Sequence, residues 1–368
     1  MHNPELYIVA GARPNFMKIA PLIRALRHGN YGLDWKLIHT GQHYDREMSD
    51  VFFEELDIPA PDISLDVGSG SHAEQTAKIM VLFEKVCLDR RPAAVVVIGD
   101  VNSTLAASIV AKKLGIPVAH VEAGLRSRDW NMPEEVNRVV TDSISDHLFV
   151  TERSGVDNLL AEGRTPDSIH FVGHVMIDNL FFQRDKLAGT DTSNWGSSKF
   201  KRRYRKYGVV TLHRPSNVDD PNTLAAILTA LNEISKDLPL IFPVHPRTRQ
   251  NLDKLKLHMS DLMVLTAPLS YMDFLNLWKD ATMVLTDSGG IQEETTALGI
   301  PCLTIRENTE RPITVLEGTN VLVGTDRGAI VREAHQVLAG QAKRGRRPDL
   351  WDGKAAERIV STLAGRLV

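Results

Sequence analysis

The sequence predicts an α/β protein with two Rossmann-like, doubly wound domains. Short apolar runs alternate with helical stretches along the chain, as in strand–helix–strand units. Some runs, such as residues 93–98, are almost wholly apolar, which is typical of strands buried on both faces of a parallel sheet. The alternation stops in a polar, then basic stretch, residues 184–207, and begins again after it. This break predicts two similar α/β halves with a cleft between them.

In the first half, each expected strand is an apolar run that ends at a Gly or a polar residue, and Pro or polar residues open the helices. The expected strands are 6–10, 35–39, 93–98, 117–121, 145–150 and 169–172. The expected helices are 14–27, 51–56, 73–88, 102–114 and 156–162, with a further helix beginning at Pro133.

The second half repeats this alternation after the basic stretch. Its expected strands are 209–212, 240–244, 263–265, 283–285, 302–305 and 321–323. Its expected helices are 223–236, 271–278 and 292–298, and the chain closes with an amphipathic helix over 355–367.

The composition excludes several classes of protein. Of 368 residues, 43% are hydrophobic and 24% charged, which is ordinary for a globular protein, and the net charge of -3 favours neither nucleic acid nor an anionic membrane as partner. Cys87 and Cys302 stand in apolar surroundings and are expected to be reduced thiols. The chain starts directly in a strand without a signal peptide, so we expect a cytoplasmic location.

Two neighbouring strands of the first half end in carboxylates. Asp100 follows the strand 93–98 and Glu122 follows the strand 117–121, while Glu134 lies in the first turn of the helix that Pro133 opens. In open α/β sheets ligands bind at the carboxyl ends of the strands, so these side chains can share one site. The structural alternative is that Asp100 caps a helix and that Glu134 complements the helix dipole or pairs with Arg138.

The segment DSGGIQEE, residues 287–294, joins a strand to a helix through two glycines. Backbone N–H groups at such a helix start favour an anion, and the hydroxyl of Ser288 adds a donor, so a diphosphate could bind here. Glu294 could accept hydrogen bonds from a ribose, and Arg311 adds a cation in the loop after the next strand. The alternative is a simple turn and helix cap.

Other motifs narrow the chemistry. His213 and His245 follow strands, where a lone histidine is more often structural than functional. Residues 11–18 are not a dinucleotide fingerprint, although Arg13 and Lys18 suit an anion near a helix start. Neither a P-loop nor a metal-ligand spacing is present, so we expect neither metal nor cofactor.

Nine motifs in this order resemble the non-hydrolysing UDP-N-acetylglucosamine 2-epimerases over residues 6 to about 325. They are GARPNFMKIAPL, TGQHYD, GDVNSTLAA, HVEAGLRS, MPEEVNR, TLHRPSN, HPRT, TDSGGIQEE and TERP. The resemblance implies the GT-B architecture, with residues 1–174 joined by the C-terminal helix 353–368 as one domain and 175–352 as the other. It also implies a site in the interdomain cleft and a homodimer.

The resemblance also implies a reaction. UDP leaves by elimination as the C-2 proton of the sugar is removed, and it adds back after C-2 is reprotonated on the other face. The implied acid/base residues are Asp100, Glu122 and Glu134, with His213 as a catalytic or phosphate-contacting residue. The implied UDP-sugar contacts are Arg13, Lys18, Phe274, Ser288, Gly289, Gly290, Glu294 and Arg311.

The chain departs from the family's allosterically activated members in one loop. Its TGQHYDREM segment is two residues longer than their TAQHREM form, so Gln42 and His43 are a possible remnant of an activator site. No Arg stands between Asp62 and Asp89, where such members place one. We therefore expect the activator site to be absent or altered.

Four other functions stay open from the sequence. The first is a 2-epimerase of a modified sugar, such as a UDP-2,3-diacetamido uronate, and the second is a hydrolysing variant that releases N-acetylmannosamine. A GT-B glycosyltransferase or an inactive nucleotide-sugar-binding module fits less well, because neither needs the set of carboxylates.

Overall fold

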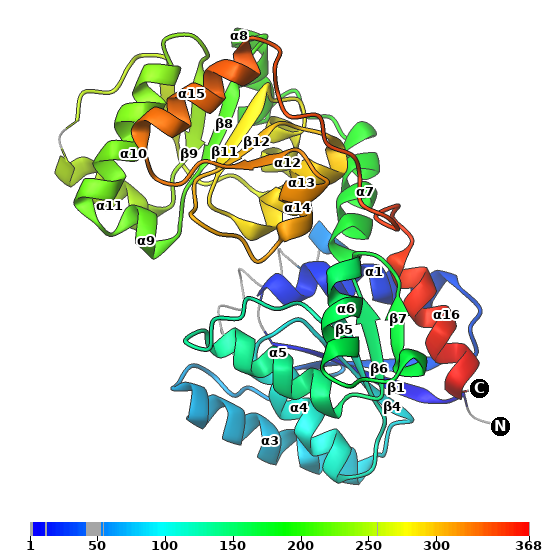
Figure 1. The fold of residues 1–368 in the computed structure, drawn as a ribbon. Coiled ribbons are helices and arrows are strands. Elements are labelled where there is room, and N and C mark those ends of the chain that lie inside the picture. Colours follow the sequence, from blue (N-terminus) through cyan, green and yellow to red (C-terminus); the bar gives the residue numbers. More distant parts are fainter. Residues whose placement is uncertain (1–2, 12, 42–52, 54, 256, 368) are drawn as a thin grey trace. The chain divides into compact units, whose positions relative to one another are not determined.

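The computed structural model describes residues 3–11, 13–41, 53, 55–255 and 257–367 (Figure 1). The chain folds into two compact units. Unit 1 runs to Asn179 and resumes at Asp349, whereas unit 2 is Leu180–Pro348. Each unit has a wholly parallel sheet with helices on it, which confirms the predicted fold class. The division falls after Asn179 and before Asp349, where the sequence analysis expects it after residue 174 and before residue 353.

Unit 1 contains, among its described residues, a seven-stranded sheet in the order β3-β2-β1-β4-β5-β6-β7. The strands are β1 (Glu5–Ala10), β2 (Asp34–His39), β3 (Ile63–Ser64), β4 (Ala94–Ile98), β5 (Val118–Ala123), β6 (His147–Val150) and β7 (Ile169–Phe171). The helices are α1 (Arg13–His28), α3 (His72–Asp89), α4 (Asn102–Lys113), α5 (Pro133–Ile144), α6 (Arg153–Ala161) and α16 (Ala355–Leu367), with a short 3-10 turn, η1 (Pro166–Ser168). The helix α7 (Val175–Ala188) begins in unit 1 and continues into unit 2. From β1 the strand order runs to β2 and β3 on one side and to β4 through β7 on the other. The switch point, at which such sheets bind ligands, therefore lies between β1 and β4.

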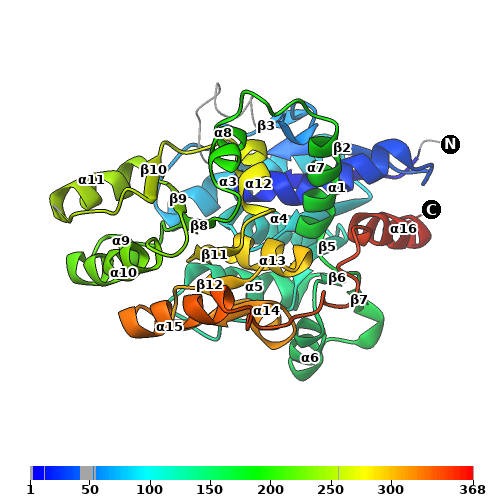
Figure 2. The ribbon, with the colours of Figure 1, turned by 90° about the horizontal axis from the view of Figure 1, so that it is seen from above.

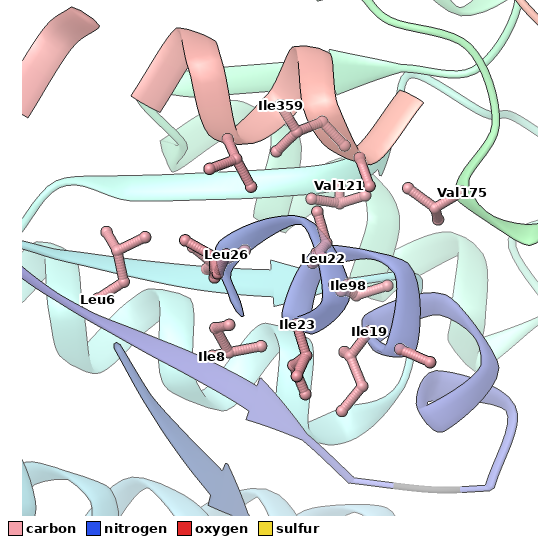
Figure 3. Packing of buried hydrophobic residues seen from close by; sticks show 14 of the residues in the cluster. Leu6, Ile8, Ile19, Leu22, Ile23, Leu26, Ile98, Val121, Val175 and Ile359 are labelled. Atoms are coloured by element: carbon pink, nitrogen blue, oxygen red, sulfur yellow. The ribbon is translucent and has the colours of Figure 1, made fainter. Parts of the chain in front are cut away.

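Both faces of this sheet are buried, which explains the apolar strands. On β1, Leu6 and Ile8 belong to one core cluster, while Tyr7 and Val9 belong to another on the opposite face. Figure 3 shows the first cluster, where side chains of α1 and α16 pack over the sheet: Ile19, Leu22, Ile23, Leu26 and Ile359. In Figure 2, α16 lies beside α1, against which it packs.

The returning helix α16 is fixed to unit 1 at its first turn. The Asp178 carboxylate on α7 accepts hydrogen bonds from the backbone N–H groups of Ala355, at 3.1 Å, and Ala356, at 2.7 Å. These two donors would otherwise have no partner within the helix. Burial raises the pKa of Asp178 to about 6.

Unit 2 contains, in its described part, a six-stranded sheet in the order β10-β9-β8-β11-β12-β13. The strands are β8 (Gly208–Thr211), β9 (Leu240–Pro243), β10 (Met263–Thr266), β11 (Met283–Thr286), β12 (Cys302–Thr304) and β13 (Asn320–Leu322). The helices are α8 (Gly196–Arg203), α9 (Pro215–Val218), α10 (Pro221–Ile234), α11 (Pro246–Leu255), α12 (Tyr271–Trp278), α13 (Gly289–Leu298), α14 (Pro312–Leu316) and α15 (Arg327–Leu338). The switch point of this sheet lies between β8 and β11.

Residues 184–207, where the sequence shows a polar and then basic break in the alternation, contain helical structure. The helix α7 continues to Ala188, and α8 packs against α12. Phe200 on α8 is buried, and Asn276 on α12 donates a hydrogen bond to the Ser197 hydroxyl at 2.7 Å. A few apolar residues within a strongly basic segment were therefore enough to make a packed helix. The helices α7, α9, α11, α14 and α15 were also absent from the prediction.

Candidate active site

The end of β4 carries Asp100 on a tightly held turn. Gly99 precedes it with a φ of +69°, a conformation that other residues adopt only at a cost. The Asp100 side chain, 28% exposed, pairs with Arg138 of α5, and Asn137 donates to the Asp100 carbonyl at 2.8 Å. Two residues of α5, the helix that follows β5, therefore hold Asp100: Arg138 contacts its carboxylate and Asn137 its backbone carbonyl.

Glu122 lies on β5 in an unusual backbone conformation. Its φ is +75°, and the pairing of β5 with β6 shifts register between Val121 and Ala123. A non-glycine residue in this region signals strain that is often kept for function. The buried Glu122 carboxylate forms an ion pair with Lys18 of α1. A Cβ on Gly99 would come within 3.1 Å of Lys18 Nζ and 3.7 Å of Glu122 Oε2, so the ends of β4 and β5 meet here.

Glu134 is half-buried in the first turn of α5. Within the described part of the chain, it forms neither a hydrogen bond nor an ion pair, so its suggested pairing with Arg138 is wrong. Arg138 instead donates to Glu135, at 2.8 and 3.0 Å, as well as to Asp100. Although burial opposes ionisation, hydrogen bonds from the Ser127 and Arg128 amides and from Arg138 lower the pKa of Glu135.

In unit 2, Asp287 organises the end of β8. Its buried carboxylate accepts hydrogen bonds from the backbone N–H groups of His213, at 3.1 Å, and Arg214, at 3.0 Å, and from the Asn217 side chain at 3.1 Å. The His213 ring reaches the same carboxylate through Nδ1 at 3.0 Å, yet it stays 54% exposed. His213 is therefore held by its backbone and Nδ1 and leaves Nε2 for a ligand.

The helix α13 begins at the glycine pair after β11. Ser288 occupies the N-cap position, but its side chain makes no capping hydrogen bond, and the first turn holds no acidic residue. An added Cβ at Gly289 would meet nothing within 4 Å. Among the described residues, the N–H groups of this first turn and the Ser288 hydroxyl have no hydrogen-bonding partner, so this helix start at the switch point can serve as an anion cradle.

Two further predicted contacts, Arg311 and Phe274, lie on the elements around the cradle. Arg311, at the start of α14, pairs with Glu293 of α13. Phe274 is half-buried on α12. Beside this helix start, Arg214 and Arg306 both contact Glu310 and, although burial opposes ionisation, lower its pKa to about 2.

Glu294 is a buried acid whose partner is a tyrosine. The Tyr271 hydroxyl, at the start of α12, donates to Glu294 Oε1 at 3.1 Å. Burial, opposed by this hydrogen bond and reinforced by the charge of Glu293, raises the pKa of Glu294 to about 8. A neutral Glu294 could both donate to and accept from a diol.

This pKa makes a prediction about stability. Folded Glu294 keeps its proton up to about pH 8, whereas the unfolded side chain loses it near 4.5, so unfolding releases a proton in this window and a rising pH destabilises the fold. We expect the melting temperature of the wild type to fall more between about pH 5 and 8 than that of Glu294→Gln, as calorimetry can measure. The raised pKa of Asp178 makes the same contribution to the pH dependence of both proteins, so it cancels in the comparison. Equal pH profiles would contradict the assignment.

The structure places the predicted residues in two groups. Lys18, Glu122, Asp100 and Glu134 lie at the carboxyl ends of the unit 1 strands, and His213, Ser288, Gly289, Gly290, Phe274, Glu294 and Arg311 lie on elements around the unit 2 switch point. Arg13 opens α1, but its side chain, like Gln42 and His43, lies outside the described residues.

The sequence analysis missed Arg138, Glu135, Asp287 and Tyr271 as parts of these groups. A spacing of three residues between Glu135 and Arg138 on a helix could have indicated that pair. Asp287 directly follows β11, and a carboxylate just after a strand is the signal by which Asp100 was found. The hydrogen bond between Tyr271 and Glu294 joins two different helices, so no spacing within the sequence could indicate it.

Two parallel α/β units with buried carboxylates in one and a glycine-rich helix start in the other define a two-domain enzyme of the GT-B type. The family model described as UDP-N-acetylglucosamine 2-epimerase matches residues 24–364. The chain belongs to the UDP-N-acetylglucosamine 2-epimerase family, a family of isomerases.

Individual relatives agree with this assignment. The chain is 43% identical to the UDP-N-acetylglucosamine 2-epimerase of Methanocaldococcus jannaschii, over 98% of both chains. It is 40% identical to the UDP-2,3-diacetamido-2,3-dideoxy-D-glucuronate 2-epimerase of Pseudomonas aeruginosa, over 98% of this chain and 99% of that one. A solved structure of the M. jannaschii enzyme, in complex with UDP-GlcNAc and UDP, matches with a TM-score of 0.84 at 42% identity, over 98% of this chain and 99% of that one.

No described helix is long and apolar enough to cross a bilayer.

Proposed function

We propose that this chain interconverts UDP-N-acetylglucosamine and UDP-N-acetylmannosamine by inverting C-2 of the sugar. The observation that carries the proposal is the buried Glu122 carboxylate, held in a strained backbone beside Asp100. Inversion at C-2 needs a base that takes the proton and an acid that returns it from the other face, and both can be carboxyl groups. Family membership supports the choice of sugar.

The reaction is balanced without a redox cofactor. A carboxylate of the set Asp100, Glu122 and Glu134 removes the C-2 proton, and the electrons of the C–H bond form a C1–C2 double bond as the bond from C-1 to the UDP oxygen breaks. This leaves UDP and a 2-acetamidoglucal. A carboxylic acid of the same set then protonates C-2 on the opposite face while UDP adds back to C-1.

Unit 2 would hold the leaving group. The N–H groups at the start of α13 and the Ser288 hydroxyl would bind the diphosphate, where they also stabilise the negative charge that develops as UDP leaves. His213 would reach a phosphate oxygen through Nε2, because Nδ1 already contacts Asp287. Glu294 would accept from the ribose, and Phe274 would contact the uracil.

Lys18 has a role in unit 1 that follows from its ion pair. A nearby ammonium favours the ionised form of Glu122, which would otherwise be disfavoured by burial. In the same site Lys18 can meet the anionic substrate. We propose that Lys18 keeps Glu122 ready as a base.

A 2-epimerase of a diacetamido uronate is the second candidate, favoured by the 40% identity to the P. aeruginosa enzyme. Parallel incubation with UDP-N-acetylglucosamine and with the UDP-diacetamido uronate, followed by chromatography, separates the candidates. We expect UDP-N-acetylmannosamine from the first substrate at a fixed equilibrium ratio. Steady growth of free UDP would show hydrolysis, and turnover of the uronate alone would replace the proposed substrate.

The proposed lack of an intact activator site makes a kinetic prediction. Asp45, one of the two extra residues of the TGQHYDREM segment, lies outside the described residues. A carboxylate near a second diphosphate would be unfavourable. Initial rates should therefore depend hyperbolically on substrate, and the reverse reaction from UDP-N-acetylmannosamine should start without added UDP-N-acetylglucosamine. A long lag in the reverse direction that traces of the epimer abolish would show that the site survives.

A homodimer, which the resemblance implies, and a cytoplasmic location, which the sequence analysis expects, are two further proposals. Light scattering on the purified chain tests the first, since a dimer has twice the mass of one chain. Fractionation of cells that produce the chain tests the second.

A further inference from the structure

A buried imidazole in unit 1 joins the two strand ends that carry Asp100 and Glu122. The His120 ring lies on β5, fully buried, with Nε2 at 2.9 Å from the carbonyl oxygen of Gly99 and Nδ1 at 2.6 Å from Asp142 Oδ1. A carbonyl oxygen can only accept, so Nε2 carries a proton and donates it. The contact fixes the peptide that immediately precedes Asp100.

Asp142, the partner of His120 Nδ1, is itself held by several contacts. Asp142 of α5 is buried, and its Oδ2 accepts from the Gly124 backbone N–H at 3.0 Å and pairs with Arg126 at 2.7 Å. Although burial opposes ionisation, the His120 and Arg126 contacts lower the pKa of Asp142. The contacts of Nε2 with Gly99 and of Nδ1 with Asp142 set the orientation of the ring from both sides.

The two contacts bracket the strained Glu122. His120 stands two residues before it and Gly124 two residues after it, and Asp142 binds both. The same pair of side chains holds the Gly99 carbonyl on the neighbouring strand β4. Three consecutive carbonyls there each accept from a side chain: Ile98 from Asn15 and Thr104, Gly99 from His120, and Asp100 from Asn137.

We propose that His120 and Asp142 form a positioning pair that sets the distance and orientation between Asp100 and Glu122. Neither member is a catalytic residue, because each acts through the backbone it holds. Errors of about 1 Å in such a constellation can cost about 10²-fold in rate. The kinetic part of this proposal rests on the proposed function, whereas its structural part concerns the two strand ends alone.

Two replacements of His120 separate the two hydrogen bonds. The amide of Asn can replace Nδ1 and keep the contact with Asp142, but it does not reach Gly99. The longer Gln can place its amide near Nε2 and keep the contact with Gly99. We expect His120→Asn to lower kcat about 10²-fold and His120→Gln to lower it about 10-fold or less, with KM and the affinity for UDP alone within about 2-fold of wild type.

Amide hydrogen exchange, followed by mass spectrometry, gives a readout independent of activity. His120→Asn should speed exchange in peptides that cover 97–102, while a unit 2 peptide over 302–306 stays unchanged. Asp142→Asn, which keeps the side-chain volume, is the second variant should His120→Asn not fold, and it should speed exchange at 121–126 and lower kcat at least 10-fold.

The outcomes separate the two proposals. Wild-type kcat or unchanged exchange at 97–102 in His120→Asn overturns the positioning pair. So does an equal loss of UDP affinity and kcat, which would indicate a general structural role. A wild type that leaves UDP-N-acetylglucosamine unchanged would contradict the proposed function, and hydrogen exchange alone would then decide on the positioning pair.

Discussion

Replacing Glu122 by Gln is expected to lower kcat about 10²-fold or more, the range for a positioned acid or base. Gln has the same size and meets the same backbone cost at a φ of +75°, so the change removes mainly the charge and the ion pair with Lys18. Asp100→Asn and Glu134→Gln should have effects of the same order. The measurement is the initial rate of epimerisation, with the melting temperature as a check on folding.

The matched control for these variants is Glu84→Gln, because Glu84 is exposed on α3, away from the strand ends. Its kcat should equal that of the wild type. If Glu122→Gln is folded and turns over at a near wild-type rate, Glu122 is not the acid or base. If only Glu122 among the three carboxylates matters, one group alone does not explain inversion, since the proton must return to the other face.

Replacing Gly289 by Leu is expected to weaken the binding of UDP itself by at least about 10-fold, or about 1.4 kcal/mol. The structure has open space at this Cβ, so the fold should tolerate the side chain. The side chain would nevertheless cover the N–H groups that start α13. A bulky replacement of Ser288 or Gly290 should act in the same direction.

Calorimetry with UDP alone measures this effect without the sugar. The control is Gly365→Leu, since Gly365 also lies in a helix with nothing within 4 Å of an added Cβ, but on α16 of unit 1. The control should bind UDP as the wild type does. An unchanged affinity in Gly289→Leu would place the diphosphate elsewhere.

The strands and their ends could be predicted from the sequence because hydrophobic runs mark them directly. Residues 94–98 are all buried, and the run stops where the glycine and the carboxylate begin. In parallel sheets a strand's end also gives its place at the ligand-binding edge, so Asp100, Glu122 and Asp287 stand where this rule puts them. The helix α8 was not predicted because its sequence, GSSKFKRR, is mostly polar and charged, and Phe200 is the apolar residue that it buries.

The partners of the charged residues could not be predicted in the same way. Arg138 had two carboxylates within reach along its helix and bonds to Glu135, not Glu134. Its second partner, Asp100, follows the strand β4. The pair of His120 and Asp142 depends on how α5 packs beside β5. Such contacts follow from the tertiary packing of elements, which local spacing does not encode.

Proton NMR of the chain with UDP-N-acetylglucosamine in deuterated water tests the central claim most directly. Proton transfer at C-2 predicts that both epimers lose the C-2 proton signal as deuterium enters, and that UDP-N-acetylmannosamine appears at the same time. The Glu122→Gln variant should slow both events together. Epimerisation with the C-2 proton retained would contradict the account, because the inversion would then proceed without removal of that proton.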